Sequence, residues 1–461
     1  MKALHDPTGA LARGLAAIRR QFDVPGAFPA EVIAAAEIAA RRTPAAHVDR
    51  TGEAFVTLDP ASSTDLDQAF RIEAAGSDLL LHYAIADVAW FVTGGDPLDV
   101  EAWKRGVTVY LPDGKAPLYP PVLSENAASL LPGGPRPAVV FTVRVDPAGL
   151  ATLDAVQRQL IVNQRKFGYE TAQVAELPAG FAEFSARIHG AEAARGAARV
   201  DPPEQEVEAL AGGGYALAFR PRAPAEEGNA ALSLACNLAV AAALFDHRTG
   251  LFRVMAAPDA RALGRLQHTA RALKVEWPKG ATLTQFEKRL DGTIPAQAAM
   301  MAAIRRAGSG ASYEPFAAGK TPWHAAIAGT YVHATAPLRR LADRYVCQAA
   351  LAVVNGQPVP AEVSAAFTAL PNVMDEADMR SNGTDRAVID LAEAVVLGGR
   401  EGEKFKAVVT DIDERGARIQ LTGEAVVSRV PAHRVEPGQE IDVRLVTADA
   451  ERRLLTFERL G

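Results

Sequence analysis

The sequence predicts an α+β protein, with a strand-rich first part, a helical second part and a small all-β domain at the C-terminus. Strand patterns gather between residues 51 and 165, and helix patterns take over from about residue 228. The two kinds of element do not alternate regularly, which favours an α+β or irregular α/β domain over a doubly wound parallel sheet. We therefore expect a helical region at 1–50, a main domain at 51–398 and a barrel at 403–461.

The composition is that of an ordinary globular protein. The chain has 461 residues, of which 49% are hydrophobic and 23% charged, and its formal net charge is −6. This charge does not indicate a nucleic-acid binder, although it leaves room for a local basic channel. Cys236 and Cys347 lie in apolar helical patterns, so we expect buried free thiols and a cytoplasmic protein. No membrane span is expected, and we predict a monomer.

The first 50 residues are expected to form two alanine-rich helices, Leu11–Phe22 and Pro29–Arg42, separated by Pro25-Gly26. Such a pair forms either a helix-turn-helix unit that binds nucleic acid or an arm packed on the main domain. Both interpretations remain open at this point.

The main domain is expected to begin with strands and to continue with helices. Alternating apolar residues predict six strands, namely Ala54–Leu58, Ala69–Glu73, Leu79–Asp87, Val107–Leu111, Ala138–Val145 and Val156–Val162. Apolar helical patterns and caps predict four helices, namely Ala230–Phe245, a helix capped by Asp259 that ends at Leu273, Pro337–Val354 and Met374–Leu397.

A linker beginning at Gly398-Gly399 separates the main domain from a last group of short strands. Their turns contain glycine, and five strands are predicted, namely Lys404–Asp411, Ala417–Leu421, Ala425–Pro431, Glu440–Thr447 and Leu454–Glu458. Five short strands of this size suit a five-stranded OB barrel, a domain that commonly binds single-stranded nucleic acid.

Three carboxylates follow the first predicted strand of the main domain. Asp59 is expected at the end of the strand, and a turn that contains Pro60 and Ser63 brings Asp65 and Asp67 back toward it. Several like charges in one place are unfavourable unless a positive group lies between them. Magnesium and manganese ions prefer such oxygen ligands. The alternative is a solvated, aspartate-rich turn.

A second cluster of charged residues lies far downstream, in Thr335-Ala-Pro-Leu-Arg339-Arg340. Pro337 suits a first helical turn, so Arg339 is expected near a helix N-terminus, where free N–H groups favour a phosphate. The arginine side chain adds a planar pair of donors. Alternatively, Arg339 or Arg340 pairs with Asp343 on the helix surface.

Taken in order, the motifs of this chain resemble those of the ribonuclease II / ribonuclease R family of processive 3′→5′ exoribonucleases. The blocks that carry the resemblance are Thr57-Leu-Asp59-Pro, Thr64-Asp65-Leu-Asp67-Gln68-Ala69, His82-Tyr-Ala-Ile-Ala-Asp87, Thr108-Val-Tyr110-Leu-Pro112, Pro120-Pro-Val-Leu-Ser124 and Thr335-Ala-Pro-Leu-Arg339-Arg340. Each block is weak by itself, and their common order and spacing make the match specific.

The resemblance implies hydrolysis of single-stranded RNA from its 3′ end to nucleoside 5′-monophosphates, with the 3′ tails of structured RNA as further substrates. It implies Mg²⁺, with Mn²⁺ as a substitute, held by Asp59, Asp65 and Asp67 and by the Gln68 carbonyl, with two ions serving catalysis. Asp67 and Arg339 are the implied catalytic residues, and Arg339 would contact the scissile phosphate.

The resemblance also implies contacts to RNA outside the metal site. Tyr110 would stack on a base, and Tyr169 would contact a ribose near the 3′ end. Arg340 and Asp385 are the other implied RNA-binding residues. The short helical N-terminal region would stand where the family usually has cold-shock barrels.

Three positions depart from the family pattern. Gln68 replaces an acid, Val200 replaces a large aromatic residue, and Ala230-Ala231 replaces a pair of acids. These departures keep a second interpretation open, in which the chain is a catalytically weakened member that binds RNA or acts as a regulator. A third interpretation is a general metal phosphohydrolase with a similar acidic loop.

Overall fold

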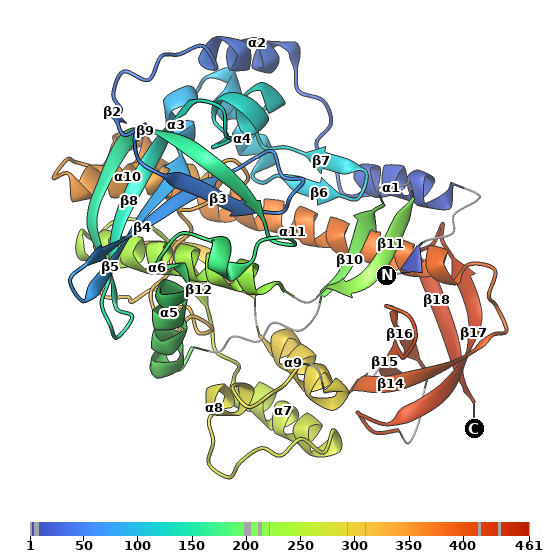
Figure 1. Ribbon diagram of the computed structural model, residues 1–461. Helices are drawn as coiled ribbons and strands as arrows, with labels where there is room; N and C mark the ends of the chain where they lie inside the picture. Colours follow the sequence, from blue (N-terminus) through green and yellow to red (C-terminus); the bar gives the residue numbers. More distant parts are fainter. Residues whose placement is uncertain are drawn as a thin grey trace.

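The computed structural model describes residues 2–3, 9–197, 204–210, 214–220, 222–292, 294–308, 310–413, 416–431 and 435–460. Within these residues the α+β prediction is confirmed (Figure 1): a twisted sheet and its helices form the main body, and a small barrel stands beside it. The N-terminal helices lie along the main body.

The sheet of the main domain closes on itself. Its strands are β2 (Val48–Asp49), β3 (Phe55–Asp59), β4 (Gln68–Ala75), β5 (Asp78–Ala86), β8 (Pro135–Val145) and β9 (Ala151–Gly168). Pairing runs from β3 through β4, β5, β8 and β9 and returns to β3, because the two halves of the long β9 pair with different strands. This closure brings the end of β3, and therefore Asp59, beside the end of β9.

Five of the six predicted strands of the main domain belong to this sheet. The sixth, Val107–Leu111, is the shorter β6 (Val109–Leu111), which pairs with β7 (Gly114–Ala116) in a separate hairpin. Figure 1 shows this hairpin near the middle of α11, outside the closed sheet.

Three long helices pack against the sheet or against one another. α6 (Pro224–Asp246) contacts β3, β5, β8 and β9, and α10 (Leu341–Val354) contacts α6, β9 and α11 (Ala361–Leu397). All three helices differ from their predicted bounds. α6 was predicted as Ala230–Phe245, so it begins six residues earlier than predicted. α10 begins four residues later than predicted, and α11 begins earlier and continues through Pro371.

One helix in the described part of the chain, α6, is long and apolar enough to cross a membrane by length and composition alone. Length and composition alone neither confirm nor contradict the prediction that the chain has no membrane span. In the structure 67% of its apolar window is buried inside the protein, as in the core helix of a folded domain.

The two N-terminal helices pack on different parts of the main domain. α1 (Ala10–Gln21) lies against α11 through Leu11, Leu15 and Ile18, and α2 (Ala30–Ala39) lies against α4 (Pro97–Arg105). This arrangement is the one expected of a packed arm. In addition, the Arg19 guanidinium pairs with Asp113, 2.6 Å away, in the turn of the β6–β7 hairpin.

The remaining elements surround this framework. The predicted helix cap at Asp259 is confirmed, since its side chain accepts a hydrogen bond from the backbone N–H of Ala262 at the start of α7. The other elements are β1 (Lys2–Ala3), α3 (Val88–Phe91), a π-helical turn (Leu123–Ala127), a 3₁₀ turn (Val174–Glu176), α5 (Phe181–Arg195), β10 (Glu204–Ala209), β11 (Tyr215–Arg220), β12 (Leu251–Met255), α7 (Ala260–Ala272), α8 (Leu283–Glu287), α9 (Pro295–Ala307) and β13 (Ala311–Pro315).

The C-terminal domain has the five predicted strands. They are β14 (Lys404–Asp413), β15 (Gly416–Leu421), β16 (Val427–Val430), β17 (Glu440–Asp449) and β18 (Leu454–Leu460), in the order β16-β15-β14-β17-β18. The edge strands β16 and β18 contact each other, so the sheet curls into a nearly closed barrel, as predicted. Leu397, the last residue of α11, is buried in the barrel core and joins the two domains.

Candidate active site

A cavity of about 860 Å³ opens where the β3–β4 loop, the β6–β7 hairpin, α6 and the segment before α10 meet. Eight of the nine residues singled out in the sequence line it, namely Asp59, Asp65, Asp67, Gln68, Tyr110, Tyr169, Arg339 and Arg340. The ninth, Asp385, lies on α11 with an exposed side chain and is not among the lining residues of this cavity. Residues far apart in the chain thus converge on one space.

The acidic loop is held in place by neighbouring side chains. The Ser129 hydroxyl donates to the Thr64 carbonyl, 2.7 Å away, and accepts from the Leu66 N–H, 2.9 Å away. Lys166 Nζ donates to the carbonyl oxygens of Ala61 and Ser63, at 2.7 and 2.6 Å. The loop is therefore fixed by specific bonds, unlike a solvated turn. Neither supporting residue was given a role in the sequence analysis.

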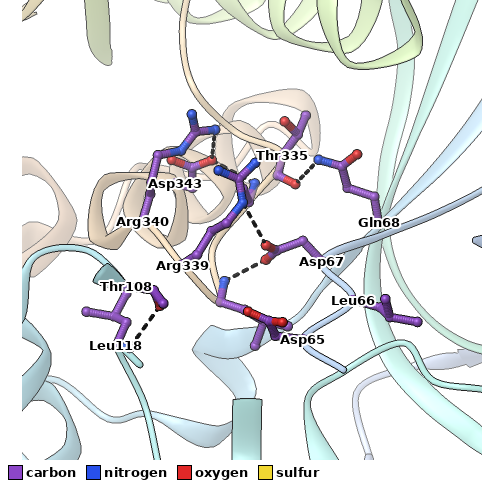
Figure 2. Close-up of polar contacts among 12 residues, drawn as sticks. Asp65, Leu66, Asp67, Gln68, Thr108, Leu118, Thr335, Arg339, Arg340 and Asp343 are labelled. Atoms are coloured by element: carbon purple, nitrogen blue, oxygen red, sulfur yellow. Dashed lines mark hydrogen bonds and ion pairs between the residues drawn. The ribbon is translucent and has the colours of Figure 1, made fainter. Parts of the chain in front are cut away.

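Asp67 and Arg339 meet in the cavity, as Figure 2 shows. Arg339 Nε lies 3.5 Å from Asp67 Oδ2, and the Leu338 N–H donates to Asp67 Oδ1 at 2.6 Å. The Asp67 side chain is 6% exposed, whereas that of Arg339 is 43% exposed, so the guanidinium remains accessible to a ligand. Burial raises the pKa of Asp67 well above its usual value, and the charge of Arg339 opposes this shift.

The N-terminus of α10 does not form the expected phosphate site. The helix begins at Leu341, and the residues from Pro337 to Arg340 form the turn before it. The Leu338 N–H is bound to Asp67, and the Ala336 N–H donates to Asp343 Oδ2 at 2.7 Å. Carboxylates of the chain itself therefore take these amide groups, and the exposed guanidinium of Arg339 offers donors to an anion.

Arg340 has a different environment from Arg339. Its Nη2 donates to Asp343 Oδ2 at 2.9 Å, and the Asp343 side chain is fully buried. The alternative of an arginine–Asp343 pair thus describes Arg340, although the pair lies in the interior and not on the helix surface. Arg340 lines the cavity, but its guanidinium serves first to neutralise a buried carboxylate.

Gln68 is the residue that departs from the expected acid, and its side chain is fully engaged by the protein. Its Oε1 accepts hydrogen bonds from the Tyr83 hydroxyl at 2.5 Å and from Ser233 Oγ at 3.2 Å. Its Nε2 donates to the Thr335 carbonyl at 2.7 Å (Figure 2). An amide oxygen has two lone pairs, and both are used. These three bonds make Gln68 a link between β4, α6 and the Arg339 segment, and a metal ion would have to displace one of them to bind the Gln68 carbonyl.

The β6–β7 hairpin holds Asp65 from one side. The Tyr110 hydroxyl donates to Asp65 Oδ2 at 2.9 Å, and Lys115 Nζ lies 2.8 Å from Asp65 Oδ1. Tyr110 is 47% exposed, so its ring remains available for stacking. Lys115 was not singled out in the sequence, because one lysine in a turn carries no motif signal.

Tyr169 and α6 form another wall of the cavity. The Tyr169 hydroxyl accepts a hydrogen bond from Asn229 Nδ2 at 2.8 Å, and its N–H donates to the Asp59 carbonyl at 3.0 Å. Ala230 lines the cavity where the family pattern has an acid, while Glu226, one helical turn earlier, lines it as well. Sequence reasoning missed Glu226, whose carboxylate is paired with Arg220 at 3.1 Å.

Asp59 carries a buried oxygen, Oδ2, that has no hydrogen-bond partner among the described residues. Burial raises the pKa of Asp59 to about 7, against the opposing charges of Arg339 and Lys166. A buried, unpaired carboxylate oxygen beside a cavity fits a cation that is bound there. Nevertheless, no group of three or more potential metal ligands converges in the part of the chain that the structure describes. Asp59 and Asp67 fit a divalent ion, and Asp65 is held by Lys115.

Two other expectations are settled or left open by the structure. Cys236 and Cys347 are free and buried, as predicted. Val200, the position of the missing aromatic residue, lies outside the described residues.

Comparison with known proteins identifies two regions. The RNB domain matches residues 48–355, and the RNase II-type exonuclease C-terminal S1 domain matches residues 403–460. Ribonuclease R of Mycoplasma pneumoniae is 28% identical over 81% of this chain, and ribonuclease R of Thermotoga maritima is 26% identical over 89%. The chain spans 55% and 62% of the lengths of these two proteins.

The fold has a close counterpart among solved structures. RNase R of Mycoplasma genitalium, solved in complex with ribose-methylated single-stranded RNA, superposes with a TM-score of 0.87 at 18% sequence identity. The match covers 100% of this chain and 79% of that protein. At this identity the likeness shows that the two proteins share a fold over both domains of this chain.

Proposed function

The chain belongs to the RNB domain family, and from this membership we propose that it is a 3′→5′ exoribonuclease that releases nucleoside 5′-monophosphates from single-stranded RNA. The observation that carries the proposal is the meeting of Arg339 with Asp67 in a cavity that Asp59, Asp65 and Tyr110 also line. The 3′ tail of a structured RNA is a substrate of the same kind. We further propose that the enzyme acts in the cytoplasm as a monomer.

The residues of the cavity have separate tasks in this proposal. Asp59 and Asp67 would hold Mg²⁺ or Mn²⁺, and the ion would supply charge neutralisation and an activated water. Arg339 presents an exposed guanidinium to the phosphate that is cleaved, where charge develops during the reaction. Tyr110, half exposed at the mouth, stacks on a base without reading its identity. Tyr169 lies beside Asp59 and contacts the terminal ribose.

The substitution Asp67→Asn tests this proposal. It keeps the size of the side chain and removes the charge that faces Arg339, so we expect monophosphate release from labelled oligo(A) to fall by at least about 10³-fold while RNA binding persists. The matched control is Asp154→Asn, because Asp154 pairs with Arg144 away from the cavity. Normal turnover in the Asp67 variant would refute the assignment.

A second candidate is an RNA-binding protein with weakened catalysis. Two observations favour it. The Gln68 carbonyl accepts hydrogen bonds from Tyr83 and Ser233, and Lys115 forms an ion pair with Asp65. The same assay separates the candidates. Wild-type protein that binds oligo(A) with Mg²⁺ or Mn²⁺ present and releases no monophosphate supports the binding protein, and steady release supports the exonuclease.

A further inference from the structure

We infer that Lys115 is a tethered cation that neutralises Asp65 in place of a second divalent ion, so that this site binds one divalent ion where two were expected. The inference rests on the proposed function, because it concerns how that site is charged. It differs from that proposal by giving a role to a residue that belongs to none of the motifs.

The hairpin places Lys115 on Asp65 by its register. Tyr110 and Lys115 are directly opposite each other in the β6–β7 pair, and both side chains reach Asp65. Lys115 Nζ lies 2.8 Å from Oδ1, and the Tyr110 hydroxyl lies 2.9 Å from Oδ2. Each oxygen of Asp65 therefore already has a partner, and the Lys115 ammonium repels a divalent ion that approaches the same carboxylate.

A second carboxylate fixes Lys115 in this position. Its Nζ also lies 3.2 Å from Glu125 Oε1, and the Thr64 hydroxyl donates to Glu125 Oε2 at 3.0 Å. The Lys115 side chain is 19% exposed, so the pair is partly shielded from water and stronger than a surface ion pair. The ammonium group thus lies between two carboxylates, as a bound cation would.

The hairpin is also tied to the segment that carries Arg339. The Thr108 N–H donates to the Arg339 carbonyl at 3.0 Å, and the Leu118 N–H donates to the Thr108 hydroxyl at 3.0 Å (Figure 2). Lys115 is therefore attached to the same framework as the arginine, so its position relative to Asp65 is fixed by the fold.

The other potential ligands leave room for one ion. The Gln68 carbonyl is saturated, and Asp67 Oδ1 accepts the Leu338 N–H while Oδ2 faces Arg339. Among the three carboxylates of the loop, Asp59 alone has an oxygen that is buried and unpartnered in the described structure. A single divalent ion beside Asp59 and Asp67 satisfies this oxygen, whereas a second ion on Asp65 would be repelled by the Lys115 ammonium.

Metal stoichiometry provides the test. Mn²⁺ is titrated into the full-length protein without RNA, and binding is followed by calorimetry and by the paramagnetic resonance signal of free Mn²⁺. We expect wild type to bind one Mn²⁺ and Lys115→Met, which keeps length and removes charge, to bind two. Should the second ion be loosely held, its affinity in the variant still exceeds that in wild type by about tenfold or more, because a close positive charge has been removed.

Two further variants show whether the direct pairing is responsible. Lys115→Arg keeps the charge and is expected to bind one Mn²⁺. Lys320→Met removes a cation that pairs with Glu314 and does not line the cavity, so the count is expected to stay at one. Lys115→Gln is the neutral replacement to measure when circular dichroism shows that the methionine variant is misfolded.

Three outcomes overturn the inference: two Mn²⁺ in wild type, an unchanged count and affinity in the neutral Lys115 variants, or an equal gain in Lys320→Met. Release of monophosphates by wild type is measured in parallel. One bound Mn²⁺ with no release would refute the exonuclease proposal alone, because the count of ions does not depend on turnover.

Discussion

Buried carboxylates occur both in the cavity and at the junction between α11 and the barrel, and they differ in what surrounds them. Burial raises the pKa of Asp59 in the cavity and of Glu393 at the junction, each to about 7. Glu393 Oε1 accepts hydrogen bonds from Gln205 Nε2 at 2.6 Å and from the Val427 N–H at 2.7 Å, so it links β10, α11 and β16.

The two carboxylates reach a similar pKa, but the shifts have different meanings. Asp59 Oδ2 has no partner among the described residues, and Asp59 lines the same cavity as Asp67 and its exposed arginine. Glu393 has neutral donors and only 4% exposure. A raised pKa therefore marks a burial cost in both regions, and an unused oxygen facing a cavity distinguishes the site from the structural link.

After Asp67→Asn, the largest expected effect comes from Arg339→Ala in the cavity. The exposed guanidinium makes few contacts within the fold, so its loss should lower RNA hydrolysis by about 10²–10³-fold with little change in melting temperature. Single-turnover rates and thermal unfolding measure the two quantities. Arg144→Ala is the control, because this half-exposed arginine pairs with Asp78 and Asp154 on the sheet. A variant that keeps most of its rate would remove the reason for treating the cavity as the functional region.

The site could be predicted from the sequence only where residues belong to a motif. The spacing of Asp59, Asp65 and Asp67 and the resemblance to a known family placed them with Arg339. Lys115 and Glu226 were not identified, since a single charged residue in a hairpin or on a helix has many structural explanations. Their positions depend on a hairpin and a helix that meet the loop only in the folded chain.

Local patterns also explain which parts of the fold were predicted. Alternating apolar residues gave the strands, because alternation follows from the pleat of each strand. The closure of the sheet was missed, since it requires β9 to pair with both β8 and β3. The start of α10 was misplaced because Pro337 suits the first turn of a helix as well as the turn before it. The bond from the Leu338 N–H to Asp67, across 271 positions, is invisible to any local pattern.

A smaller effect on both activity and stability is expected from Gln68→Glu. A glutamate keeps an acceptor for Tyr83 and Ser233 but cannot donate to the Thr335 carbonyl, so a buried charge would face a carbonyl oxygen. We expect a loss of about 1–3 kcal/mol in the free energy of unfolding and a fall of about tenfold in rate. Urea unfolding and the oligo(A) assay measure these changes.

Gln157→Glu is the control for this substitution, because Gln157 lies on the exposed side of β9. If Gln68 were a poor metal ligand, the glutamate would instead increase Mn²⁺ affinity and activity. That result would mean that Gln68 acts with Asp59 in binding the metal ion. It would not then be a purely structural link of the kind that Glu393 provides.

The smallest effect belongs to Glu393→Gln and concerns stability alone. The folded-state pKa of Glu393 is about 7 and its ordinary value is 4.5, so the folded state holds this proton more tightly than the unfolded state does. The stabilisation by the proton is complete below pH 4.5 and is lost as the pH rises to about 7. Glutamine keeps an acceptor for Gln205 and Val427 and removes the titration. We therefore expect the variant to match wild type at pH 5 and to exceed it by about 1–3 kcal/mol at pH 8.

Urea unfolding at pH 5, 6, 7 and 8 measures this difference, and Glu458→Gln on the exposed face of β18 is the control. RNA hydrolysis by Glu393→Gln should equal that of wild type at every pH, because both neighbours of the carboxylate are structural. A loss of hydrolysis without a loss of stability would contradict this separation. It would mean that the junction transmits its charge state to the cavity through α11, and that the two regions respond to one equilibrium.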